Sequence, residues 1–475
     1  MRVLYVSESL GTPSRSRGIF NFSISFVELL NGVGARVDLV IENNRWLKSV
    51  KRLQAAEVAQ ATYQYLATGR FDFAWDFRSR RYRIIFAALR PLLQLWFTVC
   101  SFAVSSPSPT VRSNCYDLGK VSDKNRNLQL FDGLVAPFRF YYRSLAHAVL
   151  GLSPPVVDAS AYDLVVVDAP QFIAVKGVSP QRIWTVIHDL IPLHSSQNEA
   201  KRRLFLRRLN ATLALGGKLI FVSRATQDDF HATFASHKTK NEYLIYPAIR
   251  SNLAEMAQGA ALRSAPRPAG LQTSGQAPED EVSGGDARRL SSCAGTIPAF
   301  DLSLPYFVTV TSDEPHKNIE TVTQAFYRQL RGLANLVVLG DIDSRRYDAG
   351  PQANIFFAGY VSDAEKVAYF GHACGLIFAS LHEGFGIPLI EGAVLGLPVL
   401  CSNIDVFREI ARDHAFYFDP GDCASLAGAV KASLADPETA ARRAAALRKM
   451  VLARFSQATI EADVRAALAD LPKAD

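Results

Sequence analysis

Apolar runs typical of buried β-strands alternate with helical patterns along most of the chain. The helical pattern is clearest at residues 20–34, where Phe22, Phe26, Leu29 and Leu30 recur at helical spacing. The segments with strand-like runs are residues 2–9, 36–42, 162–170, 182–190 and 216–230, followed by 305–311, 334–341, 354–361, 374–380 and 396–402. Continuous Val, Ile and Leu runs in such repetition are typical of parallel sheets covered by helices on both faces. We therefore expect an α/β protein.

Two stretches interrupt this rhythm and divide the chain. Residues 45–155 are rich in arginine and aromatic residues, and we interpret them as an insertion in an N-terminal domain that spans residues 1–250. Residues 251–303 are poor in large apolar residues and rich in Gly, Ser and Pro, which predicts a flexible linker. A second domain is expected at residues 304–455, and a C-terminal helix at 456–475 is expected to cross back to the first. A chain of 475 residues is too long for one ordinary core, so two domains fit its length.

Composition narrows the class of protein. Apolar residues make up 49% and charged residues 20% of the chain, which describes a globular protein. The net charge of +7 indicates either an anionic partner or ordinary solubility charge, and both interpretations stay open. The six cysteines include no CxxC pair, so we expect neither a zinc site nor a disulfide framework. Free cysteines are typical of a reducing compartment, and we expect one here. Because the N-terminus is interpreted as a buried strand rather than a signal peptide, we expect a cytoplasmic location.

Two segments bear on membrane or nucleic-acid binding. Residues 82–104 are strongly apolar, but Arg83, Arg90 and other polar residues interrupt them, so a full membrane span is not expected. They fit either a buried helix pair or an amphipathic surface on the inner face of the plasma membrane. The basic stretch at residues 201–209 fits a solvated helix face or an attraction to anionic lipid. No nucleic-acid partner is expected.

A glycine turn between a strand and a helix is the most informative motif. The stretch HEGFGIPLIEG, residues 382–392, leaves the C-terminal end of a buried strand and starts a helix with Pro388 near its first position. Ligands in open α/β sheets bind beyond the carboxyl ends of the strands. The N–H groups of a helix start attract phosphate, and Gly384 and Gly386 let the backbone approach it closely.

Carboxylates stand on both sides of this turn. Glu383 and Glu391 are eight positions apart and could each accept hydrogen bonds from the hydroxyls of a different sugar ring. A diphosphate flanked by two sugars is a nucleotide sugar, which we predict as the ligand. The alternative is a tight turn with surface carboxylates. Lys317, in EPHKN after another strand, could stabilise the charge that builds on leaving phosphates.

These motifs resemble glycosyltransferase family 4, a family of retaining enzymes with the GT-B fold, and within it the bacterial polysaccharide mannosyltransferases. Glu383 and Glu391 match the family's E-x7-E signature, and residues 354–410 resemble it throughout. Residues 311–326 resemble its E-P-x-K-N segment, and residues 186–193 its H-D-L-I-P segment. The resemblance implies a GT-B fold, in which two Rossmann-like domains with parallel sheets face each other across a cleft.

The resemblance also implies roles for individual residues. Glu383 would contact the transferred sugar, Glu391 the ribose and Lys317 the diphosphate, while His188 would lie near the donor sugar and acceptor. The catalytic set is therefore His188, Lys317 and Glu383. The donor-binding set adds the start of the glycine-turn helix, namely Gly384, Phe385, Gly386 and Ile387.

Two donor-binding positions depart from the family pattern. Gly18 stands where the family has a loop with two adjacent glycines, but Arg17 precedes it here. Thr311 stands three residues before the Glu-Pro pair, where many relatives have an arginine. The diphosphate would then depend more on Lys317 and on the helix start.

The reaction implied by the resemblance is hexosyl transfer with retention of configuration. The implied donor is GDP-mannose, and the implied acceptor is a lipid-linked oligosaccharide or polysaccharide of the cell surface. No metal or cofactor is expected, and we interpret Asp341-x-Asp343 as a turn rather than as a metal-binding DxD motif. Two alternatives stay open: a nucleotide-sugar 2-epimerase of GT-B fold, and a non-catalytic scaffold that binds nucleotide sugars.

Overall fold

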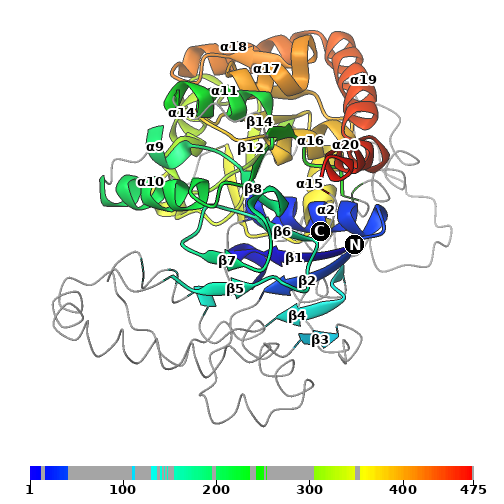
Figure 1. Cartoon of the computed structure of the whole chain (residues 1–475). Coiled ribbons are helices and arrows are strands. Elements are labelled where there is room, and N and C mark those ends of the chain that lie inside the picture. Colours follow the sequence, from blue (N-terminus) through cyan, green and yellow to red (C-terminus); the bar gives the residue numbers. More distant parts are fainter. Residues whose placement is uncertain are drawn as a thin grey trace. The chain divides into compact units, whose positions relative to one another are not determined.

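The computed structural model divides the chain into two compact units. Unit 1 comprises Met1–Ala248 and Phe455–Asp475, and unit 2 comprises Ile249–Arg454 (Figure 1). The residues that the structure describes are 1–11, 17–40, 110–112, 130–135, 140, 141, 144, 147, 154–194, 199–235, 242–250, 253, 304–347 and 354–472. Residues 82–104 and most of 251–303 lie outside this set, so the predictions made for them stay predictions.

Unit 1 contains an eight-stranded sheet. Its strands, in spatial order, are β10 (Glu242–Leu244), β9 (Lys218–Phe221), β8 (Ile183–Ile187), β6 (Leu164–Val167), β1 (Arg2–Val6), β2 (Arg36–Val40), β4 (Gly133–Val135) and β3 (Thr110–Arg112). All neighbours pair in parallel except β3 and β4. The strand order reverses between β1 and β6, and such a reversal is where α/β sheets bind ligands. A separate pair, β5 (Val156–Asp158) and β7 (Ala174–Lys176), completes the strands described in this unit.

The predicted insertion at residues 45–155 contributes to this sheet. Its two described strands, β4 and β3, extend the edge beyond β2, and β4 runs parallel to β2 like the rest of the sheet. Part of the stretch therefore forms the edge of the sheet, and its interpretation as an insertion stays a prediction. Both strands have only three residues, too few for an apolar pattern to reveal them.

The last helix belongs to unit 1. The helices described in this unit are α1 (Glu8–Gly11), α2 (Arg17–Gly32), α9 (Ile191–His194), α10 (Glu199–Leu213), α11 (Arg224–Thr233) and α20 (Gln457–Ala469), with a 3-10 turn at Pro180–Arg182. Helix α20 packs against α2 (Figure 1), and the Arg465 guanidinium donates to the Gly32 carbonyl oxygen at 2.9 Å. Beyond α20, the buried Lys218 ammonium lies 2.7 Å from the Asp470 carboxylate.

Unit 2 contains a six-stranded sheet that is parallel throughout. Its spatial order is β13 (Ile355–Gly359), β12 (Asn335–Leu339), β11 (Tyr306–Val310), β14 (Gly375–Phe378), β15 (Val399–Ser402) and β16 (Phe416–Phe418). The helices whose bounds the structure describes in this unit are α14 (Ile319–Gln329), α15 (Asp363–His372), α16 (Ile387–Val394), α17 (Asp405–Ala411), α18 (Cys423–Ala435) and α19 (Pro437–Arg454), with 3-10 turns at Pro315–Lys317, Ser344–Arg346 and Arg412–His414. The order reverses between β11 and β14, so the expected ligand position lies beyond the ends of these two strands.

Alternate residues of these strands supply two cores, one on each face. Phe307 and Leu336 pack into a cluster with α14 and α18, whereas the next residues, Val308 and Val337, pack with Phe370 of α15 on the other face. This period of two, with both faces buried, explains why the strands have continuous apolar sequences. Both units are therefore parallel α/β layers, as the apolar pattern predicted.

Among the described helices, none combines the length and apolar composition needed to cross a membrane.

Candidate functional site

The loops that follow β11 and β14 are held together at the point where the unit 2 sheet reverses. The backbone N–H of Leu381 donates to the His316 carbonyl oxygen at 2.7 Å. Asn318, which adopts a left-handed conformation with φ of 54°, donates its side-chain amide to the Ala379 carbonyl at 3.1 Å and to the Pro420 carbonyl at 2.8 Å. These bonds fix the short 3-10 turn that carries Lys317 against the end of β14.

Lys317 and Glu383 form an ion pair at this point. The Lys317 Nζ lies 2.5 Å from Glu383 Oε1, and Ser380 Oγ donates to the same oxygen at 2.7 Å. The Glu383 side chain is 11% exposed and that of Lys317 is 23% exposed, so both charges are largely removed from water. The structure therefore brings together two residues that lie 66 positions apart in the sequence and that were predicted to share one site.

The glycine turn starts α16 in the predicted place. The helix begins at Ile387, followed by Pro388, and Gly386 before it has a φ of 109°, which disfavours any residue with a side chain. A Cβ atom there would also lie 3.0 Å from the Phe407 ring. Residues 384–387 therefore form the turn between the end of β14 and the N-terminus of α16, where backbone N–H groups and the helix dipole favour an anion.

Glu391 lies in α16 and pairs with a lysine that sequence reasoning missed. Its Oε1 atom is 2.7 Å from the Lys366 Nζ, and both side chains are at least nine-tenths buried. Lys366 lies in the first turn of α15, where its Nζ also approaches the Asp363 carboxylate at 3.4 Å. Among the described contacts, none joins this pair to Lys317 and Glu383. The only sequence signal for Lys366 is a charge at a position that the helical pattern buries.

Thr311 follows β11 directly and is half-buried. Its carbonyl oxygen closely approaches Gly340 at the end of β12, where a Cβ atom would lie 1.9 Å away. A threonine supplies no positive charge here. Two residues after Thr311, the Asp313 carboxylate pairs with the Arg346 guanidinium at 3.7 Å.

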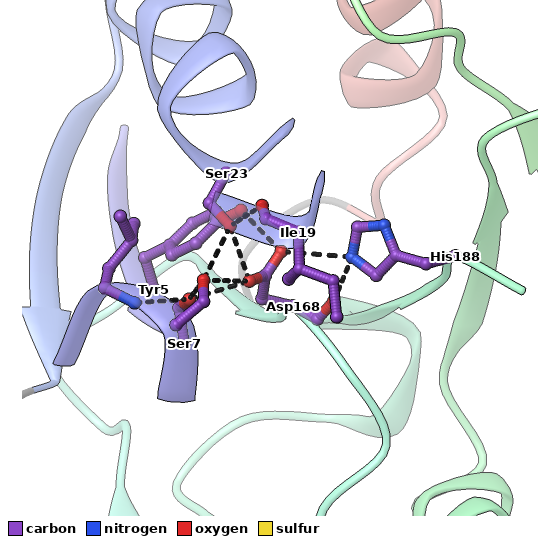
Figure 2. A network of polar contacts seen from close by, with 8 residues as sticks. Tyr5, Ser7, Ile19, Ser23, Asp168 and His188 are labelled. Atoms are coloured by element: carbon purple, nitrogen blue, oxygen red, sulfur yellow. Dashed lines mark hydrogen bonds and ion pairs between the residues drawn. The ribbon is translucent and has the colours of Figure 1, made fainter. Parts of the chain in front are cut away.

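In unit 1, His188 belongs to a buried polar cluster around Asp168, which sequence reasoning also missed. Asp168 follows β6, its side chain is 1% exposed, and Figure 2 shows it between serine side chains and the His188 ring. Ser7 and Ser23 donate to its Oδ2 at 2.7 and 2.6 Å, and the Tyr5 hydroxyl donates to Oδ1 at 3.0 Å. We call Tyr5, Ser7, Ser9, Ser23, Asp168 and His188 the Asp168 cluster.

The cluster fixes the tautomer of His188. Its Nε2 lies 2.8 Å from the backbone carbonyl oxygen of Asp168 and 3.5 Å from its carboxylate (Figure 2). Because a carbonyl oxygen can only accept, Nε2 carries a hydrogen and Nδ1 is left for another partner. Phe22 of α2 packs edge-on against the ring at 4.8 Å between centroids. Burial and the Asp168 charge raise the pKa of Tyr5 well above its usual value, so its hydroxyl stays a donor.

Two further predicted positions have no special geometry. Gly18 lies at the start of α2 and is exposed, and a Cβ atom there would meet no neighbour within 4 Å. Asp343 is held by the Arg345 guanidinium at 2.8 and 3.0 Å. Within the described residues, no group of three His, Cys, Asp or Glu side chains is placed to hold a metal ion.

His316, next to Lys317, makes stability depend on pH. Burial, and secondly the Lys317 charge, lower the pKa of His316 below its usual 6.5. The unfolded chain then binds the proton more readily, so the stabilising contribution is complete above about pH 6.5 and is lost as the pH falls through the folded pKa. We expect the free energy of unfolding to fall more between pH 7.5 and pH 5.5 in the native chain than in His316→Gln. Urea denaturation at both pH values measures this, and equal losses would contradict the prediction.

Comparison with known proteins shows which proteins the chain resembles in sequence. Residues 297–450 match the family model for glycosyl transferases group 1. The serotype-specific mannosyltransferase WbdA of Escherichia coli is 29% identical over 263 residues, which are 53% of this chain and 29% of that protein. The O-antigen chain mannosyltransferase RfbU of Salmonella typhimurium is 31% identical over 132 residues, which are 26% of this chain and 37% of that protein. The chain thus spans well under half the length of these curated relatives.

Solved structures resemble the chain over almost its whole length. Anabaena Alr3699/HepE in complex with UDP and glucose has a TM-score of 0.57 and 15% identity, covering 99% of this chain and 100% of that one. WaaG, a glycosyltransferase involved in lipopolysaccharide biosynthesis, has a TM-score of 0.54 and 13% identity, covering 98% of both chains. The predicted fold class is confirmed, because the chain has the GT-B fold. The predicted resemblance is also confirmed: residues 297–450 match the model for glycosyl transferases group 1, and the chain resembles bacterial mannosyltransferases.

Proposed function

We propose that the chain transfers a hexosyl group from a nucleotide sugar to a lipid-linked oligosaccharide or polysaccharide in the synthesis of a cell-surface polysaccharide. The observation that carries this proposal is the Lys317–Glu383 pair beside the N-terminus of α16, at the reversal of the unit 2 sheet. A cation, a carboxylate and a helix start at one strand end are suited to a diphosphate joined to a sugar.

Each side chain then has a chemical task. Lys317 and the helix start stabilise the negative charge that develops on the diphosphate as the bond from the sugar C1 to the phosphate oxygen breaks. Glu383 exchanges its contact with Lys317 for the hydroxyls of the transferred sugar. The acceptor oxygen bonds to C1 on the face that the diphosphate leaves, and its proton passes to the departing phosphate oxygen, so the anomeric configuration is retained. This route uses no metal and no cofactor.

We propose mannose as the sugar and GDP-mannose as the donor. The names of two relatives support this choice, since WbdA and RfbU are both described as mannosyltransferases. Because Nε2 of His188 is held by Asp168, we assign its Nδ1 atom to a hydroxyl of the sugar or acceptor. In unit 1 the described residues supply one buried carboxylate near His188, that of Asp168, and its oxygens are already held by hydroxyl groups. A 2-epimerase, which would need free catalytic carboxylates in this unit, is therefore less well supported than a transferase.

A panel of GDP-, UDP- and dTDP-sugars tests the proposal. We expect saturable binding of GDP-mannose by calorimetry, slow release of α-mannose without acceptor, and transfer when a lipid-linked acceptor is added. Proton NMR of the first-formed product reports whether configuration is retained. Release of free nucleotide with a C2-altered sugar would favour the epimerase, and binding without any turnover would favour the scaffold.

A further inference from the structure

Lys366 occupies a position that is unfavourable for a lysine. It lies in the first turn of α15, where the helix dipole disfavours a positive charge, and its side chain is only 10% exposed. Burial of an ammonium also costs hydration free energy. The Glu391 and Asp363 carboxylates, at 2.7 and 3.4 Å, offset these costs.

Stability does not explain this buried pair. Replacing a buried ion pair with apolar residues of similar size is often neutral or stabilising, because each charge must give up its water. The helical pattern of α15 would place an apolar residue at position 366 against the sheet, as it does at Phe370 one turn later. We therefore look for a role of Lys366 in positioning the carboxylate it holds.

The pair lies at the ligand-binding edge of the unit 2 sheet. Helix α15 starts shortly after the end of β13, and α16 starts after the end of β14, so both N-termini lie at the edge formed by the carboxyl ends of the parallel strands. Lys366 is the fourth residue of α15 and Glu391 the fifth of α16, which places the pair near both N-termini. Lys366 holds Oε1 of Glu391, and no described residue donates a hydrogen bond to Oε2. A carboxylate oxygen has room for two such bonds.

We propose that Lys366 is a positioning residue that fixes Glu391 by its Oε1 atom, so that Oε2 accepts hydrogen bonds from the vicinal ribose hydroxyls of the donor nucleotide. The inference rests on the proposed nucleotide-sugar site. Helix α15 then contributes to donor recognition through Lys366, which lies outside the E-x7-E motif. The site then recognises the two vicinal hydroxyls of the ribose.

A chemical double-mutant cycle tests this role. The probes are GDP and 2′,3′-dideoxy-GDP, titrated by calorimetry into the native full-length chain, Lys366→Met and Lys366→Arg. We expect Lys366→Met to bind GDP about 10- to 100-fold more weakly, the loss that follows from one hydrogen bond to a charged group. The affinity for dideoxy-GDP should change less than twofold, because that ligand lacks the hydroxyls. Lys366→Arg, which keeps the charge, should recover most of the GDP affinity.

Matched variants separate positioning from folding. Lys218→Met removes another buried lysine, which pairs with the exposed Asp470 in unit 1, and it should leave both affinities unchanged. Combining Lys366→Met with Glu391→Gln removes both charges of the buried pair, so this double variant serves if the single variant does not fold. It should bind GDP and 2′,3′-dideoxy-GDP with equal affinity. Equal loss of both nucleotides in Lys366→Met, or an unchanged GDP affinity, would overturn the inference and leave the proposed function standing. A native chain that binds neither GDP nor UDP overturns both.

Discussion

Replacing Lys317 with methionine is expected to lower the turnover number of sugar transfer about 100- to 1,000-fold, the effect of removing one group that stabilises charge in the transition state. Its ammonium contacts Glu383 at 2.5 Å beside the N-terminus of α16, and it is the charged group we assign to the leaving diphosphate. Donor affinity should fall less than turnover, because the charge that needs stabilising grows as the bond breaks. Steady-state kinetics with GDP-mannose and the lipid-linked acceptor measures both.

The control for this variant is Lys431→Met. Lys431 is an exposed lysine on α18 in the same unit, so its loss changes the net charge equally without touching the site. Turnover should then stay within twofold of the native value. If Lys317→Met has the same melting temperature as the native chain and also the same turnover number, the catalytic assignment of Lys317 is wrong.

Replacing Asp168 with alanine is expected to lower the free energy of unfolding by about 3 kcal/mol and also to reduce turnover. The stability loss follows because the buried hydroxyls of Tyr5, Ser7 and Ser23 lose a shared acceptor. Activity should fall because the cluster sets the positions of α2 and His188. Asp168→Asn keeps the size and much of the hydrogen bonding, so it should recover most of the stability. Urea denaturation and kinetics on the same samples give the two effects.

Asp38→Asn is the matched control for the Asp168 variants. Asp38 is another buried aspartate of unit 1, held by the Arg2 guanidinium at 3.0 Å and the Tyr162 hydroxyl at 2.8 Å, with no described contact to His188. Its substitution should cost stability without a specific loss of turnover. The role of the Asp168 cluster in catalysis is refuted if Asp38→Asn and Asp168→Asn, compared at equal stability, lower turnover equally.

The sequence predicts the elements of this molecule better than the pairing of its polar side chains. The strand before the glycine turn and the start of α16 at Ile387 are readable because an apolar run, two glycines and a proline follow one another locally. The Asp168 cluster is not readable in this way. Its serines lie 145 to 161 residues from Asp168, and only the sheet order places β1 beside β6.

The same limit explains the other misses. Lys366 stands in a helix whose pattern would suit an apolar residue, and its partner Glu391 lies 25 positions further on. Strand β4 was missed because three residues carry no period, although pairing with β2 makes it part of the sheet. The structure around these residues depends on contacts between residues that are far apart in the sequence, and local sequence patterns do not predict such contacts.

The chain passes from unit 1 to unit 2 after Ala248 and returns after Arg454, so unit 2 is one continuous segment while unit 1 is made of two. The two ends of unit 1 meet, since the rings of Tyr246 and Phe455 lie 5.3 Å apart. Residues 249–454 can therefore be excised and produced as an uninterrupted polypeptide. Unit 1 can be produced as one polypeptide only if a short linker joins Ala248 to Phe455. Truncation after Arg454 would remove α20, the helix that packs against α2.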